Sequence, residues 1–174
     1  GWSFDVTTSL DGTRLRIAPA TPKDVPILVT LIRELAEYER LSHVVSMMEK
    51  MLEEALFGSR SAAEAVIGYW DDEPAAYAVF FTNFSTFLGR PGLYLEDLFV
   101  RPAVRQNGIG RAMLRHVAQV CVHRGYPRME WVVLDWNEPA INFYKSLGAA
   151  QLAEWRVFHL TGDALANLAD NQSA

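Results

Sequence analysis

A loop with two glycines near the middle of the chain is the first feature suited to chemistry. Residues 93–100 read as an apolar strand, Pro102 ends it, and residues 105–110 lead into a helix. Small residues let backbone N–H groups approach an anion, and the start of a helix adds a partial positive charge. Arg105 and Arg111 could add side-chain donors. The loop is therefore either a phosphate-binding site or an ordinary strand-to-helix turn.

Two familiar phosphate-binding loops do not fit this stretch. A dinucleotide-binding fingerprint would need a third glycine where Met113 stands. A Walker A loop would need Gly-Lys followed by Ser or Thr, and that sequence does not occur. The pattern therefore disfavours both a nicotinamide-binding fold and a P-loop.

Two further side chains could handle protons. Glu96 lies in the strand before the loop, where a carboxylate is either a general base or a solvated surface group. Tyr144 lies on a short helix, where a tyrosine either donates a hydrogen bond to a reacting group or packs in the core. Because side chains alternate along a strand, Glu96 and Asp97 should face opposite sides unless a bulge intervenes. The residues alone favour a solvated surface carboxylate for Glu96 and a core side chain for Tyr144.

Metal and disulfide chemistry find little support in the residue pattern. The four histidines have no metal-ligand spacing among them. The single cysteine, Cys121, excludes an internal disulfide and a cysteine metal cluster. We therefore expect no metal and a reducing, cytoplasmic location.

The composition fits one domain with a sizeable core. The chain has 174 residues, 50% of them hydrophobic, and a formal net charge of −5. The acidic balance argues against nucleic-acid binding, which normally needs a basic face. The longest apolar runs fall short of the ~20 residues that a membrane span requires. We expect a single domain over residues 1–174, with its core at about 14–165, and no membrane or nucleic-acid partner.

The first third of the chain predicts a strand and two helices. Apolar residues alternate at 15–17, which predicts a short strand. Thr21 predicts the N-cap of a helix near 22–40, where apolar residues recur at helical spacing. A capping box that begins at Ser46 predicts a second helix, which Gly58 should end.

The middle of the chain predicts a hairpin and a long helix. Residues 65–69 and 75–81 are apolar and flank a turn sequence, so they predict antiparallel strands. Residues 83–92 predict a polar loop before the strand that carries Glu96. Apolar positions three and four apart then predict a helix from Ile109 to Gly125.

The last third predicts alternating strands and helices. Residues 129–134 predict a buried strand, and residues 137–147 a helix with Asn137 as its cap. Residues 151–160 predict a last strand, and Thr161 caps a short C-terminal helix. The mixture of strands and helices indicates one α/β domain.

These stretches together resemble the GNAT superfamily of acyl-CoA-dependent N-acetyltransferases, whose motif Arg/Gln-x-x-Gly-x-Gly/Ala matches residues 105–110. Within it the chain is most similar to the diamine acetyltransferases, which include the spermidine/spermine enzymes. The similarity covers about residues 14–165 and is carried by residues 16–21, 31–39, 94–100, 137–145 and 155–158.

The resemblance implies a fold, a cosubstrate and a partner. The fold would be a single GNAT-like α/β domain, with a mixed, mostly antiparallel twisted sheet and helices on both faces. The cosubstrate would be acetyl-CoA, with no metal. The family forms homodimers in which the last strands meet, and Trp155, Val157 and Phe158 offer apolar surface for this contact.

The resemblance also implies roles for individual residues. Glu96 would take the proton from the amine, through water, and Tyr144 would hydrogen-bond the departing CoA sulfur. The implied cofactor-binding residues are Leu98, Phe99, Val100, Arg105, Gln106, Asn107, Gly108, Ile109, Gly110, Arg111 and Asn137. The implied amine-binding residues are Tyr38, Glu39, Glu96 and Glu154.

One departure from the family pattern concerns the phosphate loop. The family usually has glycine where this chain has Gln106; cradling by the backbone survives if neither Gln106 nor Asn107 needs a positive φ, and we expect cofactor binding to persist. Their side-chain amides could instead donate to the diphosphate.

The sequence leaves three functions open. The first is N-acetylation of a small di- or polyamine, or of a lysine-like amine such as thialysine, by direct attack in a ternary complex. The second is acetylation of a protein or peptide. The third is a CoA-binding regulatory module that does not catalyse.

Overall fold

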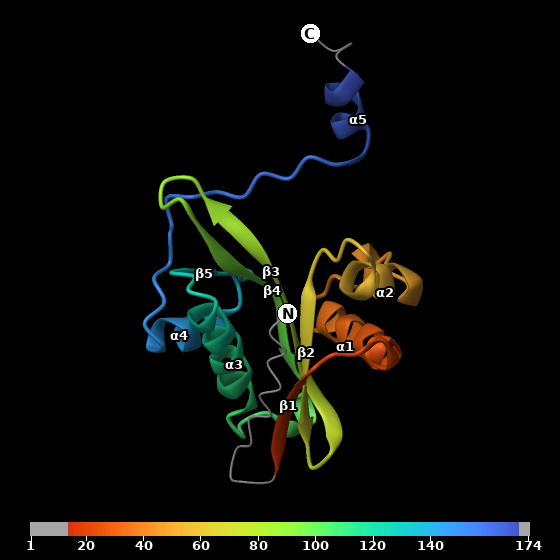
Figure 1. Cartoon of the computed structure of the whole chain (residues 1–174), viewed down its shortest axis with the longest axis vertical. Coiled ribbons are helices and arrows are strands. Elements are labelled where there is room, and N and C mark those ends of the chain that lie inside the picture. The colour runs from red at the N-terminus through yellow and green to blue at the C-terminus, as the bar shows by residue number, and fades with distance from the viewer. Residues whose placement is uncertain (1–13, 171–174) are drawn as a thin grey trace. The chain divides into compact units, whose positions relative to one another are not determined.

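A five-stranded sheet in the order β1-β2-β3-β4-β5 forms the centre of the N-terminal part of the protein (Figure 1). The computed structural model describes residues 14–170. These residues form two compact units, the first ending at Val132 and the second beginning at Val133. The described strands are β1 (Leu15–Pro19), β2 (Glu64–Trp70), β3 (Glu73–Ser85), β4 (Arg90–Val100) and β5 (Met129–Glu130). The helices of the first unit are α1 (Val25–Tyr38), α2 (Glu49–Phe57) and α3 (Ile109–His123).

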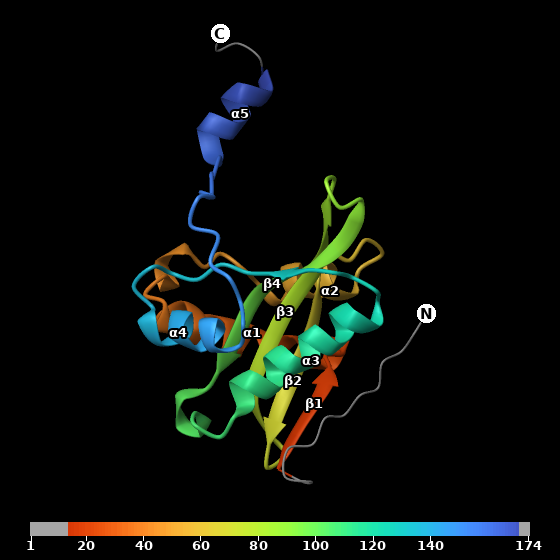
Figure 2. The same cartoon turned by 90° about the vertical axis from the view of Figure 1, so that its left-hand side faces the viewer.

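The sheet is mostly antiparallel, and helices cover both of its faces. Strands β1 to β4 pair antiparallel in sequence order, and β5 pairs with β4 in parallel. Figure 2 shows α3 in front of the sheet and α1 and α2 behind it. The predicted fold class is therefore confirmed.

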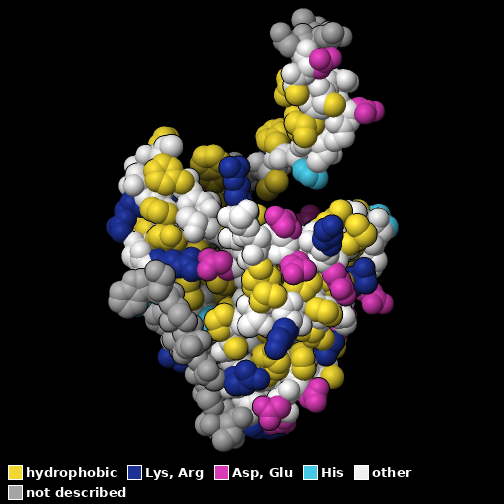
Figure 3. Space-filling view, turned by 45° about the vertical axis from the view of Figure 1, so that its right-hand side comes forward, with side chains coloured by type: hydrophobic (Ala, Val, Ile, Leu, Met, Phe, Trp, Pro, Cys, Tyr) yellow, Lys and Arg dark blue, Asp and Glu magenta, His cyan; other side chains and the backbone are white. Residues whose placement is uncertain are grey.

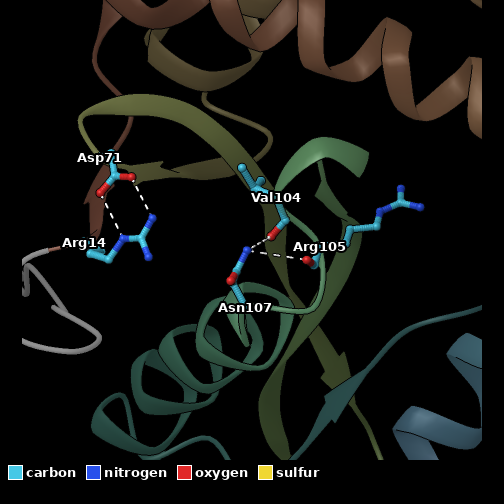
Figure 4. A network of polar contacts seen from close by, with 5 residues as sticks. All are labelled: Arg14, Asp71, Val104, Arg105 and Asn107. Carbon is cyan, nitrogen blue, oxygen red and sulfur yellow. Dashed lines mark hydrogen bonds and ion pairs between the residues drawn. The ribbon is translucent and has the colours of Figure 1, made fainter.

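A tight two-residue turn joins β2 to β3, as predicted. Asp71 and Asp72 have φ values of 50° and 65°, which is the left-handed pair that matches the twist of a hairpin. Arg14 holds the turn through two hydrogen bonds to the Asp71 carboxylate, at 3.1 and 2.9 Å (Figure 4). The local sequence thus fixes the pairing next to the turn, and the register shifts once between Gly68 and Tyr69.

The two helices after β1 begin differently. Thr21 caps as predicted: its backbone N–H donates to Asp24 Oδ2 at 2.7 Å, in a short 3₁₀ turn (Pro22–Asp24) that leads into α1. The capping box predicted at Ser46 is wrong, because α2 begins only at Glu49. A 3₁₀ turn (Ser42–Val44) precedes α2, Val45 and Met48 are extended, and Met47 packs against the core instead of continuing a helix. Gly58 ends α2 as predicted.

Alternation along the strands separates two apolar layers. One layer lies between the sheet and helices α1 and α2; Leu28 and Leu31 of α1 and Ile67 and Tyr77 of the sheet contribute to it. On the other face α3 buries its predicted apolar stripe, with Met113 fully buried. At Gly68 a Cβ would lie 2.9 Å from Met113 Sδ, so glycine permits the close approach of α3 to β2.

The polar loop predicted at 83–92 is mostly strand. β3 continues to Ser85, and β4 starts at Arg90, with Asn83 opposite Gly92. Antiparallel strands can face water, so polar residues do not prevent pairing at this end of the hairpin. The end is indeed exposed to solvent, since even the Phe84 side chain is 63% exposed. A Cβ on Gly92 would approach the Arg128 backbone oxygen to 2.9 Å, so glycine lets the chain before β5 pack closely there.

The strands predicted in the last third are shorter or missing. Residues 129–134 yield only the two-residue β5. Residues 151–160 form no strand, because a strand needs a hydrogen-bonded neighbour and the sheet described for residues 14–170 has none for them. Trp155, Val157 and Phe158 are 72%, 83% and 95% exposed.

The second unit contains the two predicted helices, α4 (Glu138–Ser146) and α5 (Gly162–Asp170). Asn137 caps α4, since its Oδ1 accepts a hydrogen bond from the Ala140 N–H at 3.4 Å. Thr161 lies at the start of α5, where its carbonyl accepts from the Leu165 N–H at 3.3 Å. Among residues 14–170, no helix is long and apolar enough to cross a membrane.

Candidate functional site

A bulge in β4 places Glu96 outside the regular strand pairing. Asp97 lies opposite Val79 and Leu95 opposite Phe80, so Glu96 is the extra residue between them. A bulge of this kind bends the strand and redirects its side chains. The exception to strict alternation therefore occurs, and Asp97 can belong to the same site as Glu96.

Asp97 is held by a buried tyrosine that sequence reasoning missed. The Tyr77 hydroxyl donates to Asp97 Oδ2 at 2.8 Å, and the Tyr77 side chain is fully buried. Burial raises the pKa of Asp97, while the hydrogen bond from Tyr77 opposes that rise. Burial and the nearby carboxylates raise the pKa of Tyr77, so its hydroxyl stays protonated and remains a donor. The only sequence signal for this pair was the possibility of a bulge.

Three carboxylates influence one another at this point. Glu39, directly after α1, has its pKa raised by burial and then by the charge of Asp97. Glu96 has its pKa raised by the same two causes in the same order. Figure 3 shows Asp and Glu side chains interspersed with Lys and Arg side chains on the face that carries α1 and α2. The cluster of Glu39, Glu96 and Asp97 attracts a cation, and the raised pKa values let its carboxylates accept a proton.

A metal ion is a poor candidate for that cation. In the part of the chain that the structure describes, no group of three or more His, Cys, Asp or Glu side chains could hold a metal. An ammonium group needs no closed ligand shell and suits carboxylates through charge-assisted hydrogen bonds.

Within residues 14–170, the edge of β4 that pairs with β5 is unpaired beyond the bulge. β5 pairs only with Leu93 and Tyr94, which precede Glu96. No further strand of the described sheet adds to β4 on this side. The backbone of Leu98, Phe99 and Val100 therefore lies on a stretch of strand edge where an extended ligand could pair with the main chain.

The loop after β4 reaches α3 through two left-handed residues. After a 3₁₀ turn (Pro102–Val104), Gln106 has φ 68° and Gly108 has φ 74°. Of the two residues for which a positive φ was in question, Gln106 adopts one and Asn107 does not. A non-glycine residue in this region is strained, and such strain persists where the surrounding structure or a function maintains it.

Asn107 stabilises the loop internally. Its Nδ2 donates to the carbonyl oxygens of Val104 at 2.8 Å and Arg105 at 3.4 Å (Figure 4). The amide thus fixes the loop shape, and backbone N–H groups are the better candidates for contact with an anion. Ile109 is buried and anchors the start of α3.

Gly110 lies on the first turn of α3, where unpaired N–H groups and the helix dipole favour an anion. A Cβ there would meet only Val100 Cγ2, at the ordinary contact distance of 3.7 Å. The packing of the chain itself therefore does not require this glycine, which leaves room for a ligand. Arg111 follows it and is exposed.

Arg105 connects the loop to α1. Its Nε donates to the Val100 carbonyl at 3.0 Å, and its guanidinium lies 4.7 Å from the centre of the Tyr38 ring and 5.8 Å from that of Phe99. These contacts place Tyr38, a predicted amine-site residue, next to the predicted phosphate loop. The first unit thus brings together Tyr38, the carboxylate cluster and the loop.

Three predicted site residues belong to the second unit. Asn137 caps α4, and Tyr144 lies half-buried on α4 with its ring 5.7 Å from that of Phe143. Glu154 is exposed in the segment between α4 and α5. Within this unit, the Asn137 cap fixes the start of the helix that carries Tyr144.

The chain is similar to known acetyltransferases. The model of the acetyltransferase (GNAT) family matches residues 29–149. The L-ornithine N5-acetyltransferase of Arabidopsis thaliana is 34% identical, with 91% of this chain and 90% of the relative covered. The thialysine N-epsilon-acetyltransferase of Mus musculus is 36% identical, with 88% and 96% covered. Among solved structures, an integron cassette protein from the mobile metagenome of V. cholerae has a TM-score of 0.78 and 25% identity, with 92% of this chain and all of that one covered.

The carboxylate cluster predicts a measurable coupling. Because the charge of Asp97 raises the pKa of Glu39 and of Glu96, the Asp97→Asn variant should lower both values toward their ordinary range. Folded-state pKa values above the unfolded ones mean that ionisation costs stability as pH rises through that interval. The variant should therefore lose less unfolding free energy between acidic and neutral pH.

Carboxyl-carbon NMR titration and urea unfolding at several pH values would measure both effects. The exposed Asp72→Asn variant is a matched control and should change neither. Unchanged titration of Glu39 and Glu96 in Asp97→Asn would contradict the coupling.

Proposed function

The chain belongs to the GNAT acetyltransferase family, and from this premise we propose that it acetylates a primary amine of a small di- or polyamine, or of a lysine-like amine such as thialysine, with acetyl-CoA. The observation that carries the proposal is the cluster of Glu39, Glu96 and Asp97, beside a strand edge and a helix N-terminus suited to CoA. Two of the chain's relatives, an L-ornithine N5-acetyltransferase and a thialysine N-epsilon-acetyltransferase, support a small amine as the substrate.

Charge explains why a carboxylate cluster suits such a substrate. An alkylamine of pKa ~10.4 is almost entirely ammonium at neutral pH, and a di- or polyamine carries at least two such charges. One ammonium can bind Glu39 and the Tyr38 ring, through charge and cation–π attraction, while another amine approaches Glu96. Repulsion among the carboxylates falls when the cation binds.

The reacting nitrogen must lose a proton before it can attack. Glu96 is the base: a raised pKa makes its carboxylate a better proton acceptor, and its exposed position lets a water carry the proton. Asp97 acts through charge, keeping the pKa of Glu96 high, and Tyr77 keeps Asp97 in place. Tyr77 and Asp97 are thus positioning residues.

The first unit also offers a fit for acetyl-CoA. Backbone groups of residues 98–100 would pair with the pantetheine arm, and the N–H groups of residues 108–111 would hold the diphosphate. Arg111 would add a side-chain donor. The bound thioester supplies the electrophilic acetyl carbon and a thiolate leaving group.

Tyr144 would donate its hydroxyl proton to a hydrogen bond with the departing sulfur. A phenol of pKa ~10 is a weak acid toward a thiolate of pKa ~8.5, so the hydrogen bond comes first and proton transfer last. Asn137, which caps the same helix, would contact the cofactor as well, and Glu154 would contribute a further carboxylate to the amine site.

A screen of amines tests the proposal directly. The protein is incubated with acetyl-CoA and thialysine, L-ornithine, spermidine or a lysine peptide, and free thiol is measured. We expect release of CoA with at least one small amine and little with the peptide. Turnover of the peptide alone would favour a protein acetyltransferase, and acetyl-CoA binding without turnover would favour a regulatory module.

The Tyr144→Phe variant tests the role of the hydroxyl. Turnover should fall by roughly tenfold or more, while acetyl-CoA affinity by calorimetry should change little, because the hydrogen bond strengthens only as the thiolate forms. Tyr126→Phe is a control that removes a tyrosine hydroxyl elsewhere and should keep normal turnover. Equal turnover in Tyr144→Phe and the unmodified protein would remove the assigned role.

The exposed residues between α4 and α5 suggest an assembly. We propose a homodimer in which Trp155, Val157 and Phe158 lose their exposure against a second copy. Light scattering at micromolar concentration should give twice the monomer mass, and Val157→Asp together with Phe158→Asp should give the monomer mass. A monomer before substitution would contradict the dimer.

A further inference from the structure

A pocket lies at the edge of the sheet where β1 ends. Its volume is about 900 Å³, and its wall includes Pro19, Leu56, Phe80 and Val120. These residues come from β1, α2, β3 and the C-terminal half of α3, and Figure 1 shows α2 and α3 on opposite sides of the sheet. The pocket shares no lining residue with the carboxylate cluster or the loop before α3.

A buried histidine in the wall of this pocket has an unsatisfied nitrogen. His116 is only 3% exposed, and its Nδ1 finds no hydrogen-bond partner within residues 14–170. Buried polar atoms of folded proteins almost always have a partner, so this exception needs an explanation. Burial also lowers the pKa of His116, which favours the neutral ring with one donor and one acceptor nitrogen.

The charges in the wall neutralise each other. Arg124 donates to both Glu64 carboxylate oxygens, at 2.8 and 2.6 Å. The rest of the wall is largely apolar and includes the rings of Phe57, Phe80 and Tyr126. The Arg124 and Glu64 charges are thus already paired with each other, whereas an uncharged ring would find contact area against the apolar wall, which His123 completes.

We propose that this pocket is a second small-molecule site, which binds an uncharged aromatic compound whose single hydroxyl group hydrogen-bonds to His116 Nδ1. A hydroxyl both donates and accepts, so it satisfies either tautomer of the neutral histidine. The volume is typical of sites that enclose a ligand of about the size of a drug molecule. The site serves a ligand other than the amine or acetyl-CoA, because it contains neither a free carboxylate nor an anion cradle.

NMR with 2-naphthol as the probe tests the site without any measurement of turnover. In the unmodified protein, 2-naphthol should cause saturable shifts of the Val66 and Val120 amides and of the His116 ring nitrogens. Naphthalene has the same rings without the hydroxyl, and it should bind about fivefold more weakly, as loss of one neutral hydrogen bond predicts. Ala20→Phe, which fills the pocket, should abolish both sets of shifts.

His116→Phe should weaken 2-naphthol about fivefold and leave naphthalene unchanged, whereas the exposed control His43→Phe should alter neither. If His116→Phe does not fold, the comparison of the two probes on the unmodified protein decides. Absence of saturable shifts up to the solubility limit would mean that only water occupies the pocket, and would overturn the proposal. Equal affinity for the two probes, or shifts centred on Glu39 and Asp97, would overturn it as well.

Discussion

The extra residue in β4 is the constraint on which the candidate site depends. With Asp97 opposite Val79 and Leu95 opposite Phe80, the strand cannot keep regular alternation through Glu96. Before this point β4 has a neighbour on each edge, and beyond it β5 no longer pairs. One irregularity therefore coincides with two features of the site: adjacent carboxylates that interact, and backbone groups at an open edge.

The ionised carboxylates reduce the stability of the folded chain. Burial and repulsion raise the pKa of Glu39 and of Glu96, which means that their ionised forms are unfavourable in the folded protein. Tyr77 offsets part of this for Asp97 through a hydrogen bond from a buried hydroxyl. Unfavourable charge of one sign, collected at one place, is complementary to a polyvalent cation.

The loop before α3 also contains an unfavourable feature, a strained backbone. Gln106 adopts a positive φ, and the Asn107 side chain uses its donors to hold the loop in that shape. Arg105 then joins the loop to the Tyr38 ring at the end of α1. The loop is thus tied on both sides, so its main chain is already ordered before any anion binds, and less entropy is lost on binding.

The sequence by itself determined the elements whose signals are local. The turn at Asp71 and Asp72, the start of the first helix at Thr21, and the Asn137 cap all follow from sterics and hydrogen bonds among near neighbours. The family motif added the proposed roles of Glu96 and Tyr144, which spacing alone left open between functional and structural interpretations.

Tertiary structure decided what depends on segments far apart in the chain. The bond between Tyr77 and Asp97 requires the register of β3 against β4, and the late start of α2 requires Met47 to reach a core formed elsewhere. Residues 151–160 alternate between apolar and polar side chains as a strand does, but they form no strand in the described sheet. Alternation determines which side chains share a face, whereas a strand also needs a neighbouring chain for its backbone hydrogen bonds. Local preference thus selects the elements, whereas pairing and burial select the site.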